Sequence, residues 1–574
     1  MKKLSSNIDV CFIDPYRGQL YSYAIASENL GISYIASVLE KKGYSVDLID
    51  CDTFNLSPKD AVFECLQKGP KIIGFTVHTW KSINPALKIV KLLRQEKFRG
   101  HIIFGGKYPT LCYSKILHLM RSLVDSICIG EGEETMLELA NCLLKNKVND
   151  WTQIDGLAYL INDNVQVNPP RKLNYDLDKL PYPKRFNAPQ ILRSNAAFSV
   201  LGSRGCWYGQ CLFCSVSRME FNKERRRRSE EIVKEILFLM DKYGVSDFMI
   251  VGDSFIGPGE KGRRELENFI EVVKKSGRHF TFGFACQAKD VDLKTFLKLK
   301  KIGLTSVFIG IESGSESDLK FYRKNSTLTD NQVAANILKE LNLNEPEGMG
   351  VGGFIFYNPE STMKDIKDNL DFLEKYGSKC DINFFTHCRI LEGSPLEEKM
   401  IAENRLTSFD WKGYHIRDPL VQLIDSLIHP IRKIVTKDID NVLIYQFKLF
   451  RVFANQSNDN TSKNIRKKSK LDLLASCSNL RKIILSLYKN IILYIENNDL
   501  SPIGKDLNLF QEKYRNLMVK YVESGIKLAQ NNGIEEMAFI NNNFLSPSKE
   551  WTVYFTALKN KIEISGHSFG YGEV

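Results

Sequence analysis

The sequence predicts an α/β protein with three parts: a flavodoxin-like doubly wound sheet, a partial (β/α)6 barrel of the TIM type, and a mostly helical C-terminal domain. Short apolar runs alternate with amphipathic stretches in two successive series, and only helical patterns remain after about residue 400. A loop with three cysteines, Cys206, Cys211 and Cys214, follows the first predicted strand of the second series. We place the domains at residues 1–148, 149–190 (a connector), 191–400 and 401–574.

The first domain is predicted from five apolar runs that have the length of buried strands. They are IDVCFIDP, YSVDLIDCD, KIIGFTV, HIIFGGK and VDSICIGEGEE, and stretches such as NPALKIVKLLRQEK between them have helical spacing. In a parallel sheet of this kind, ligands bind outside the carboxyl ends of the strands. Those ends carry Thr76, Val77 and His78, then Gly105 and Gly106, then Gly130, Glu131, Gly132 and Glu133.

The glycines at these ends allow a bulky flat ligand to approach the backbone, although they are also the residues that simple turns require. No G-x-G-x-x-G follows the first strand. The acidic GEGEE segment after the fifth strand is unsuited to a pyrophosphate, so the sequence disfavours a nicotinamide cofactor.

The second series follows a proline-rich connector that contains PPRKLNYDLDKLPYPKR. Its strands are predicted at AAFSVLGSRG, DFMIVGDSF, FTFGFACQA, SVFIGIESGS, GMGVGGFIFYN and CDINFFTHCRI. Six βα units are too few to close a full barrel, so we expect an open one with its site at the strand carboxyl ends. The cysteine loop follows the first of these strands. The basic run at residues 225–228 is interpreted as a solvated loop, with Ser229 capping the next helix.

The C-terminal part is predicted as amphipathic helices with no catalytic constellation. They are PLVQLIDSLIHPIRKIV, NVLIYQFKLFRVFANQ, LRKIILSLYKNIILYIEN and FQEKYRNLMVKYVESGIKLA. A polar, basic linker, SNDNTSKNIRKKSKLD, is expected to divide them, and EWTVYFTALKNKIEISG has the pattern of a hairpin.

Composition limits the classes of partner and compartment. The net charge of +11 is spread among interspersed acidic and basic residues, which indicates a mildly basic surface and disfavours a nucleic-acid partner. The 13 cysteines are scattered through regular segments, which is typical of a reduced intracellular protein. No signal peptide and no apolar stretch of about 20 residues is present, so we expect a cytoplasmic protein without a membrane partner.

The cysteine triplet carries the strongest chemical signal. Three thiolates hold an iron–sulfur cluster and leave one iron open to another ligand. A structural zinc site needs a fourth cysteine or histidine at short spacing. After Cys214 none occurs until Cys286, and His387 and Cys388 are farther still. The spacing therefore favours an iron–sulfur cluster over zinc or unligated thiols.

Several segments in order resemble the cobalamin-dependent radical S-adenosylmethionine (SAM) enzymes over about residues 5–400. They are ENLGISYIASVLEKKGYSVDLID, VDSICIGEGEETMLEL, IDGLAYL, LDKLPYPKR, IGIESGSE and EGSPLEEKM. Two departures stand out. The family spacing Cys-x3-Cys-x2-Cys is one residue longer here, and GCWYG is similar to the GCWWG of some maturases of ribosomal peptides. YNPEST at residues 357–362 replaces a Gly-Phe-Pro-Gly-Glu-Thr-like turn, which puts a role for Glu360 in doubt.

The resemblance implies three cofactors: a [4Fe–4S] cluster on the three cysteines, SAM and cobalamin. It implies SAM contacts at Phe213, Gly252, Asp253, Gln287 and Glu312, and cobalamin contacts at Thr76, Val77, Gly105, Gly106, Gly130, Glu131 and Gly132. Packing of the loop is the alternative role for Phe213, and an N-cap to the following loop is the alternative for Asp253. A buried carboxylate at a barrel mouth needs a partner or a ligand, which favours a ligand role for Glu312. No Asp-x-His-x-x-Gly occurs, so we expect residues 76–78 to contact the displaced nucleotide tail; His78 as lower cobalt ligand is the alternative.

The implied activity is reductive cleavage of SAM to methionine and a 5′-deoxyadenosyl radical, with methylation of an unactivated carbon in a natural product or peptide. The first alternative uses the same cofactors without methyl transfer, in oxidative cyclisation, ring contraction or rearrangement; the second is a cobalamin-binding regulator. A methylthiotransferase is disfavoured because no second cysteine triplet occurs upstream. Expected partners are the small-molecule or peptide substrate and an electron donor such as flavodoxin or ferredoxin. Candidate substrate-lining residues are Trp207, Tyr208, Tyr357, His387 and Cys388; packing is the alternative role for each, and no catalytic role is assigned.

Overall fold

The chain divides into two compact units in the computed structural model. The first consists of Met1–Val307 with Arg389–Gly413, and the second of Phe308–Cys388 with Tyr414–Val574. The structure describes residues 8–16, 28–145, 150–194, 196–219, 223–343, 352–377, 383–407, 413–428, 431–432 and 460–497, and parts of 499–517.

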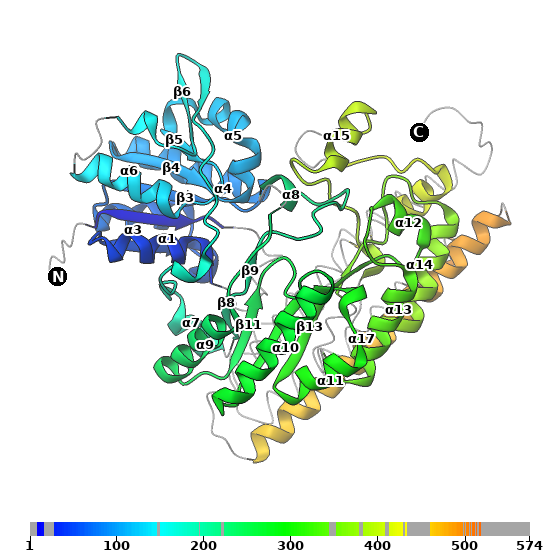
Figure 1. Ribbon diagram of the computed structural model, residues 1–574. Coiled ribbons are helices and arrows are strands. Elements are labelled where there is room, and N and C mark those ends of the chain that lie inside the picture. Colours follow the sequence, from blue (N-terminus) through cyan, green and yellow to red (C-terminus); the bar gives the residue numbers. More distant parts are fainter. Residues whose placement is uncertain are drawn as a thin grey trace. The chain divides into compact units, whose positions relative to one another are not determined.

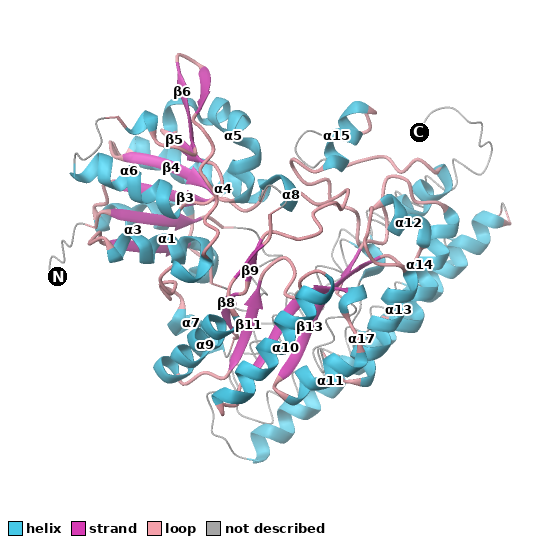
Figure 2. Cartoon of the chain, in the orientation of Figure 1, coloured by secondary structure: helices cyan, strands magenta, loops and turns pink. Residues whose placement is uncertain are grey.

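The first unit begins with a seven-stranded sheet in the order β2-β1-β3-β4-β5-β6-β7 (Figures 1 and 2). Strands β1 to β5 pair in parallel, and β6 and β7 add an antiparallel ribbon at one edge. The order of the five parallel strands confirms the predicted flavodoxin-like, doubly wound sheet. The strands are β1 Val10–Asp14, β2 Val46–Asp50, β3 Ile72–Thr76, β4 His101–Gly105, β5 Ser126–Cys128, β6 Leu157–Ile161 and β7 Asn164–Val167.

Helices cover both faces of this sheet. One core contains side chains of α3, α4 and α5, and the other contains side chains of α1 and α6. Successive residues of β1 alternate between the two cores, since Cys11 and Ile13 belong to one and Val10 and Phe12 to the other. Burial on both sides explains why the central strands β1, β3 and β4 consist mainly of apolar residues, whereas the edge strand β2 carries Asp47 and Asp50. The helices are α1 Leu30–Lys41, α2 Cys51–Phe54, α3 Pro58–Lys68, α4 Trp80–Gln95, α5 Lys107–Met120 and α6 Glu133–Lys145.

Local sequence sets several helix ends. At the start of α3, Ser57 and Asp60 form a reciprocal capping box and Pro58 occupies the first turn. The helix ends at Gly69, whose φ of +58° is the left-handed conformation that glycine adopts without strain. Capping boxes of the same kind begin α13 (Leu328–Glu340) and α14 (Met363–Tyr376) in the second unit.

His101, at the start of β4, predicts acid sensitivity of the first unit. Its Nε2 lies 2.8 Å from Ser126 Oγ and its ring meets Trp151 edge-on, and burial lowers the pKa of its imidazole from 6.5 to about 4. Because the unfolded chain takes up the proton first, stability falls as the pH drops from 6.5 towards about 4. We expect urea unfolding at pH 7, 5.5 and 4.5 to show this loss, and His101→Gln to make it smaller. An equal pH dependence in the variant would contradict the assignment.

A five-stranded sheet, in the order β14-β13-β12-β11-β8, forms the barrel part. Strand β13 begins in the first unit and ends in the second. At the predicted sixth strand, the described residues form one isolated parallel bridge, Tyr357 to His387, beside the short turn η5; residues 378–382 lie outside the described part. The strands are β8 Phe198–Leu201, β11 Asp247–Val251, β12 Thr281–Gln287, β13 Leu304–Glu312 and β14 Gly353–Phe354.

The remaining elements connect and flank these strands. In the first unit they are η1 Arg121–Leu123, η2 Trp151–Gln153, η3 Leu177–Lys179, α7 Ala188–Ser194, β9 Ser203–Arg204, α8 Val216–Met219, β10 Arg225–Arg226, α9 Ser229–Tyr243, α10 Gly259–Ser276, η4 Ala288–Asp290, α11 Leu293–Lys301 and α15 Pro395–Ala402. In the second unit they include α12 Glu316–Phe321, η5 Asn383–Phe385 and α17 Asn460–Glu496.

The C-terminal helix α17 corrects one prediction. It runs continuously from Asn460 to Glu496, so the expected linker at residues 457–472 is helical from residue 460 onwards (Figure 1). That segment is polar but contains no glycine or proline, and its lysines, arginines and leucines are good helix formers. NVLIYQFKLFRVFANQ and the predicted hairpin lie outside the described residues. No helix in the described part of the chain has the length and apolarity needed to cross a membrane.

Candidate functional site

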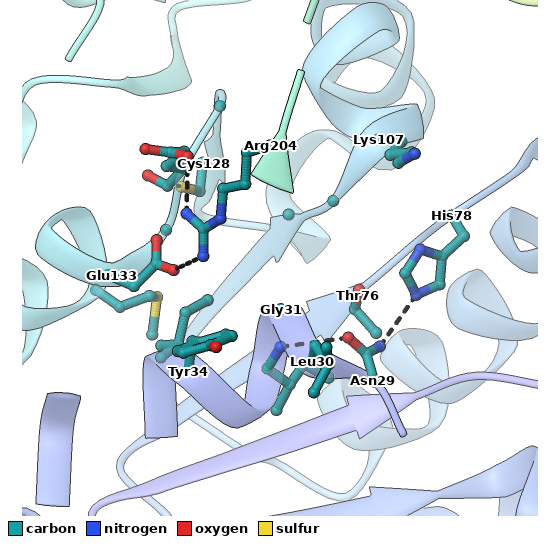
Figure 3. Close-up of a pocket in the computed structure, with 18 of the residues that line it drawn as sticks. Asn29, Leu30, Gly31, Tyr34, Thr76, His78, Lys107, Cys128, Glu133 and Arg204 are labelled. Atoms are coloured by element: carbon teal, nitrogen blue, oxygen red, sulfur yellow. Dashed lines mark hydrogen bonds and ion pairs between the residues drawn. The ribbon is translucent and has the colours of Figure 1, made fainter. Parts of the chain in front are cut away.

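A cavity of about 480 Å³ lies in the first unit, at the carboxyl ends of β3, β4 and β5 (Figure 3). One wall comes from the first sheet and includes Thr76, His78, Gly105, Gly106 and residues 130–133. The opposite wall comes from the barrel part, with Leu201, residues 203–205 and residues 251–253. The cavity therefore joins most residues that the sequence singles out in the first sheet to the base of the cysteine loop.

Glycines line the cavity in two ways. A Cβ on Gly130 would meet nothing within 4 Å and one on Gly105 would lie 3.7 Å from Cys128 Cβ, so these two leave the backbone open, whereas Gly106 and Gly74 allow close packing within the protein. Gly106 has a φ of +100°, and a Cβ there would lie 2.9 Å from the carbonyl oxygen of Val77. Gly74 of β3, which the sequence analysis missed, lies beside Phe12 of the neighbouring strand β1, and a Cβ on Gly74 would lie 2.6 Å from the Phe12 ring. A glycine in the middle of a buried strand is the signal that marks such a close approach.

Val77 differs from its two neighbours. Its side chain is fully buried in the core of the sheet, while its N–H donates to the Gly105 carbonyl and its carbonyl accepts from Tyr108. Val77 does not line the cavity, whereas Thr76 and His78 do.

Asn29 fixes the orientation of His78. The Asn29 Oδ1 accepts a hydrogen bond from the Ile32 N–H as the cap of α1, so Nδ2 is the donor. It lies 3.0 Å from His78 Nε2 (Figure 3) and 3.0 Å from Asp14 Oδ2. The His78 Nε2 must then accept, and the imidazole proton lies on Nδ1. This arrangement occupies the Nε2 lone pair and supports a contact role for His78 over coordination of a metal through Nε2. Asn29 was not singled out from the sequence; its only local signal is the helix cap.

An ion-pair cluster forms the part of the cavity wall around Glu131. Glu131 Oε1 lies 2.7 Å from Arg204 and 2.9 Å from Arg225, and Glu133 Oε1 accepts from Arg204 at 2.5 Å. Burial alone would raise the pKa of Glu131, but the guanidinium groups of Arg204 and Arg225 outweigh it and lower that pKa. Glu131 therefore lines the cavity as an ionised, paired carboxylate.

The interpretation of residues 225–228 as a solvated loop is wrong. Arg225 and Arg227 are only 3% and 8% exposed, and Arg228 rather than Ser229 occupies the cap position of α9. Arg227 bonds to Glu235, which is fully buried and also bonds to Arg185 at 2.7 Å. The arginines that are consecutive in the sequence thus pair with carboxylates from other segments of the chain.

The cysteine loop lies between β9 and α8, and its three thiols are partly buried. The Cys214 N–H donates to the Cys211 carbonyl at 3.2 Å, and the Val216 N–H donates to Cys214 Sγ at 3.5 Å. Burial raises the pKa of the Cys214 thiol, and Asp253 and Cys206 are close enough to raise it further. In the described part of the chain, no three His, Cys, Asp or Glu side chains converge on a position for a single metal ion.

The other SAM candidates fall into two groups. In the first unit, Gly252 and Asp253 line the cavity, Phe213 is partly buried, and a Cβ on Gly252 would lie 2.4 Å from Ser203 Oγ. Gln287 ends β12, and its buried Oε1 has no hydrogen-bond partner among the described residues. The cap of α10 is Pro258, so Asp253 does not cap that helix.

Glu312 belongs to the second unit and ends β13 with a φ of +62°. Its carboxylate lies 3.3 Å from Lys324 Nζ, and both side chains are largely buried. Lys324 was missed from the sequence and supplies the partner that a buried carboxylate requires. A left-handed conformation at a non-glycine residue is a local strain of the kind that accumulates at functional sites.

Among the substrate-lining candidates, Tyr357 and Cys388 are buried, whereas Trp207, Tyr208 and His387 are half-buried. Tyr357 is fully buried and its hydroxyl donates to Tyr488 at 3.0 Å, and Cys388 is 2% exposed. His387 Nε2 lies 2.8 Å from Asp425. In the cysteine loop, the Trp207 Nε1–H donates to the Ile256 carbonyl at 3.3 Å, Lys289 lies over the Trp207 ring, and Tyr208 meets that ring edge-on.

Comparison with known proteins identifies two domains. A B12-binding domain matches residues 22–140 and the radical SAM superfamily matches residues 200–373. An uncharacterized methyltransferase of Pyrococcus horikoshii is 27% identical over 415 residues, covering 71% of this chain and 86% of the relative. The 4′-phospho-dehydrooxetanocin synthase of Priestia megaterium is 25% identical over 64% of this chain and 50% of its own length. An anaerobic magnesium-protoporphyrin IX monomethyl ester cyclase of Rubrivivax gelatinosus is 25% identical over 54% of this chain and 56% of its own length.

Two solved structures share the fold. The cobalamin-dependent radical SAM enzyme OxsB, solved with aqua-cobalamin and SAM bound, superposes with a TM-score of 0.67 at 18% identity over 98% of this chain and 84% of its own. The radical SAM methyltransferase TsrM of Kitasatospora setae, solved with cobalamin and a [4Fe–4S] cluster bound, superposes with a TM-score of 0.55 at 14% identity. The match covers 71% of this chain and 78% of TsrM. At these identities, the likeness concerns the fold alone.

Proposed function

Because the chain belongs to the cobalamin-binding radical SAM enzymes, we propose that it methylates an unactivated carbon of a small-molecule or peptide substrate. The observation that carries this proposal is the cavity, whose walls come from the glycine-bearing strand ends of the B12-binding domain and from the base of the cysteine loop. A reaction that uses cobalamin and a SAM-derived radical on one substrate needs both cofactors at one site.

The residues present fit both groups. Three thiols on one loop, one of them accepting a backbone N–H, match the donor set of a [4Fe–4S] cluster with an open iron. At Gly105 and Gly130, which line the cavity, no side chain covers the backbone, so a flat ligand such as a corrin can approach it. When bound, the cluster and SAM supply a 5′-deoxyadenosyl radical and cobalamin supplies a methyl group, while the protein supplies orientation and a dry pocket.

Individual side chains then have definite tasks. The loop with Cys206, Cys211 and Cys214 holds the cluster. The buried Gln287 Oε1 is an acceptor without a hydrogen-bond donor among the described residues. The amino group or a hydroxyl of SAM would supply that donor. Asn29 holds His78 with its proton on Nδ1, as a neutral donor at the cavity wall. Glu312, held by Lys324, is proposed to accept from the ribose hydroxyls of SAM.

The second candidate function uses the same cofactors without methyl transfer. The relatives include a cyclase as well as a methyltransferase, each 25% identical to this chain over the aligned residues. The cavity by itself serves both reactions, so the two functions are distinguished by products.

The test is an anaerobic reconstitution with iron, sulfide and hydroxocobalamin, followed by SAM and a strong reductant. We expect mass spectrometry to detect 5′-deoxyadenosine and S-adenosylhomocysteine, since methylation consumes a second SAM as methyl donor. 5′-Deoxyadenosine alone would favour the reaction without methyl transfer. Neither product, from protein that holds both its cluster and cobalamin, would overturn the enzyme proposal and favour a cobalamin-binding regulator.

A further inference from the structure

We propose that Arg204 is a positioning residue that couples cobalamin binding to the cysteine loop. The inference rests on the proposed cofactors. In it, cobalamin bound against residues 130–133 and the cluster bound by Cys206, Cys211 and Cys214 each favour binding of the other, because Arg204 fixes the spacing between the two loops.

Arg204 connects the loops directly. It ends β9, two residues before Cys206, and its guanidinium donates through Nη1 to Glu131 at 2.7 Å and through Nη2 to Glu133 at 2.5 Å. Figure 3 shows this guanidinium at the cavity wall, with Glu133 on one side and Tyr34 below it. The Arg204 carbon Cζ lies 5.6 Å from the Tyr34 ring centre, and its side chain is 15% exposed. One side chain therefore contacts two carboxylates and an aromatic ring of the B12-binding domain.

The return side of the cysteine loop is bound to the same carboxylate. Strand β10 pairs antiparallel with β9, and this pairing places Arg225 opposite Arg204. Arg225 Nη1 lies 2.9 Å from both oxygens of Glu131, and its side chain is 1% exposed. The segment that carries the three cysteines is thus closed at its base by β9 and β10, and both strands bond to Glu131.

The contacts of Arg204 and Arg225 can couple the two sites because their carboxylate partners also line the cavity. Gly130, Glu131, Gly132 and Glu133 all line it. A ligand that packs against this loop restricts the two carboxylates, and through Arg204 and Arg225 it restricts the base of the cysteine loop. Charge-assisted hydrogen bonds at this burial resist rearrangement, since each separated partner would be left as a buried charge. Any such coupling acts equally in both directions.

The measurement is the dissociation constant of hydroxocobalamin for anaerobic protein with and without its reconstituted cluster. For the wild type we expect binding to be at least about fivefold tighter with the cluster, the lower end of common coupling factors. We also expect the electron paramagnetic resonance signal of the reduced cluster to change when cobalamin is added. Arg204→Gln should reduce the coupling to less than about twofold and remove the spectral change.

Two further variants separate coupling from general stability. Arg204→Lys keeps the charge but cannot bridge both carboxylates, so its coupling should be intermediate. Arg171→Gln is the matched control, because Arg171 of the connector makes a bidentate pair with Glu138 of α6 at 3.0 and 2.7 Å, and neither side chain lines the cavity. It should leave the coupling unchanged.

Three outcomes would overturn the inference. Wild-type protein that binds both cofactors with no mutual effect would refute it, and so would undiminished coupling in folded Arg204→Gln or, should that variant not fold, in Arg204→Lys. Equal loss of coupling in Arg171→Gln would assign the effect to domain stability. Protein that forms no cluster or binds no cobalamin would refute the proposed function as well, so the two failures are distinguishable.

Discussion

Replacement of Cys206, Cys211 or Cys214 by alanine is expected to abolish SAM cleavage. Each thiol supplies one of the three ligands on a single loop, and the Cys211–Cys214 turn is held by a backbone hydrogen bond that does not depend on either side chain. Loss of one thiolate leaves too few ligands for a cluster with one open iron. We expect iron and sulfide content to fall several-fold and 5′-deoxyadenosine to fall below detection, with the far-ultraviolet circular dichroism unchanged.

Cys286→Ala is the control for this series. Cys286 lies on β12 in the same unit, and burial raises the pKa of its thiol well above the usual value. Because Cys286 lies on a strand outside the cysteine loop and its side chain is buried, this variant should keep its iron content and its activity. Full cluster content in any of the three loop variants would contradict the ligand assignment. Stoichiometric zinc in the wild type, with no iron after reconstitution, would favour the zinc alternative.

The parts of the fold that the sequence predicts well are those with local signals. Strands β1 to β5 lie in mainly apolar runs, the glycines that follow β4 and β5 line the cavity, and the cysteine triplet marks its own loop. Val77 shows a signal that was present but not used. Successive side chains at a strand end point to opposite faces, so Thr76 and His78 facing the cavity implies that Val77 faces the core.

The features that were missed depend on residues far apart in the chain. The burial of Arg225 follows from Glu131, 94 residues before it, and no composition or periodicity near residue 225 indicates that partner. Tyr357 is buried because Tyr488 of α17, 131 residues later, bonds to its hydroxyl. Charge and polarity at one point of the sequence do not determine exposure; the segments that pack against that point do.

The second large effect is expected at Glu235, where a buried network joins three parts of the first unit. Arg185, in the connector, bonds to Glu235 of α9 at 2.7 Å and also to Glu28, just before α1. The side chains of Arg185, Glu28 and Glu235 are 3%, 2% and 0% exposed. Arg227 is the second cation on Glu235. Two guanidinium groups therefore share one fully buried carboxylate.

We expect Glu235→Gln to lower the free energy of unfolding by about 3–5 kcal/mol, the usual cost of removing one partner from a buried ion pair. Urea unfolding measures this directly. Glu267→Gln is the matched control: Glu267 pairs with Lys298 at 2.6 Å, but the two side chains are 45% and 38% exposed, so the loss should stay below about 1 kcal/mol. Equal, small losses in both variants would mean that water reaches the network. Because Glu235, through Arg185 and Glu28, links the barrel to the B12-binding domain, Glu235→Gln should also weaken cobalamin binding while Glu267→Gln should not.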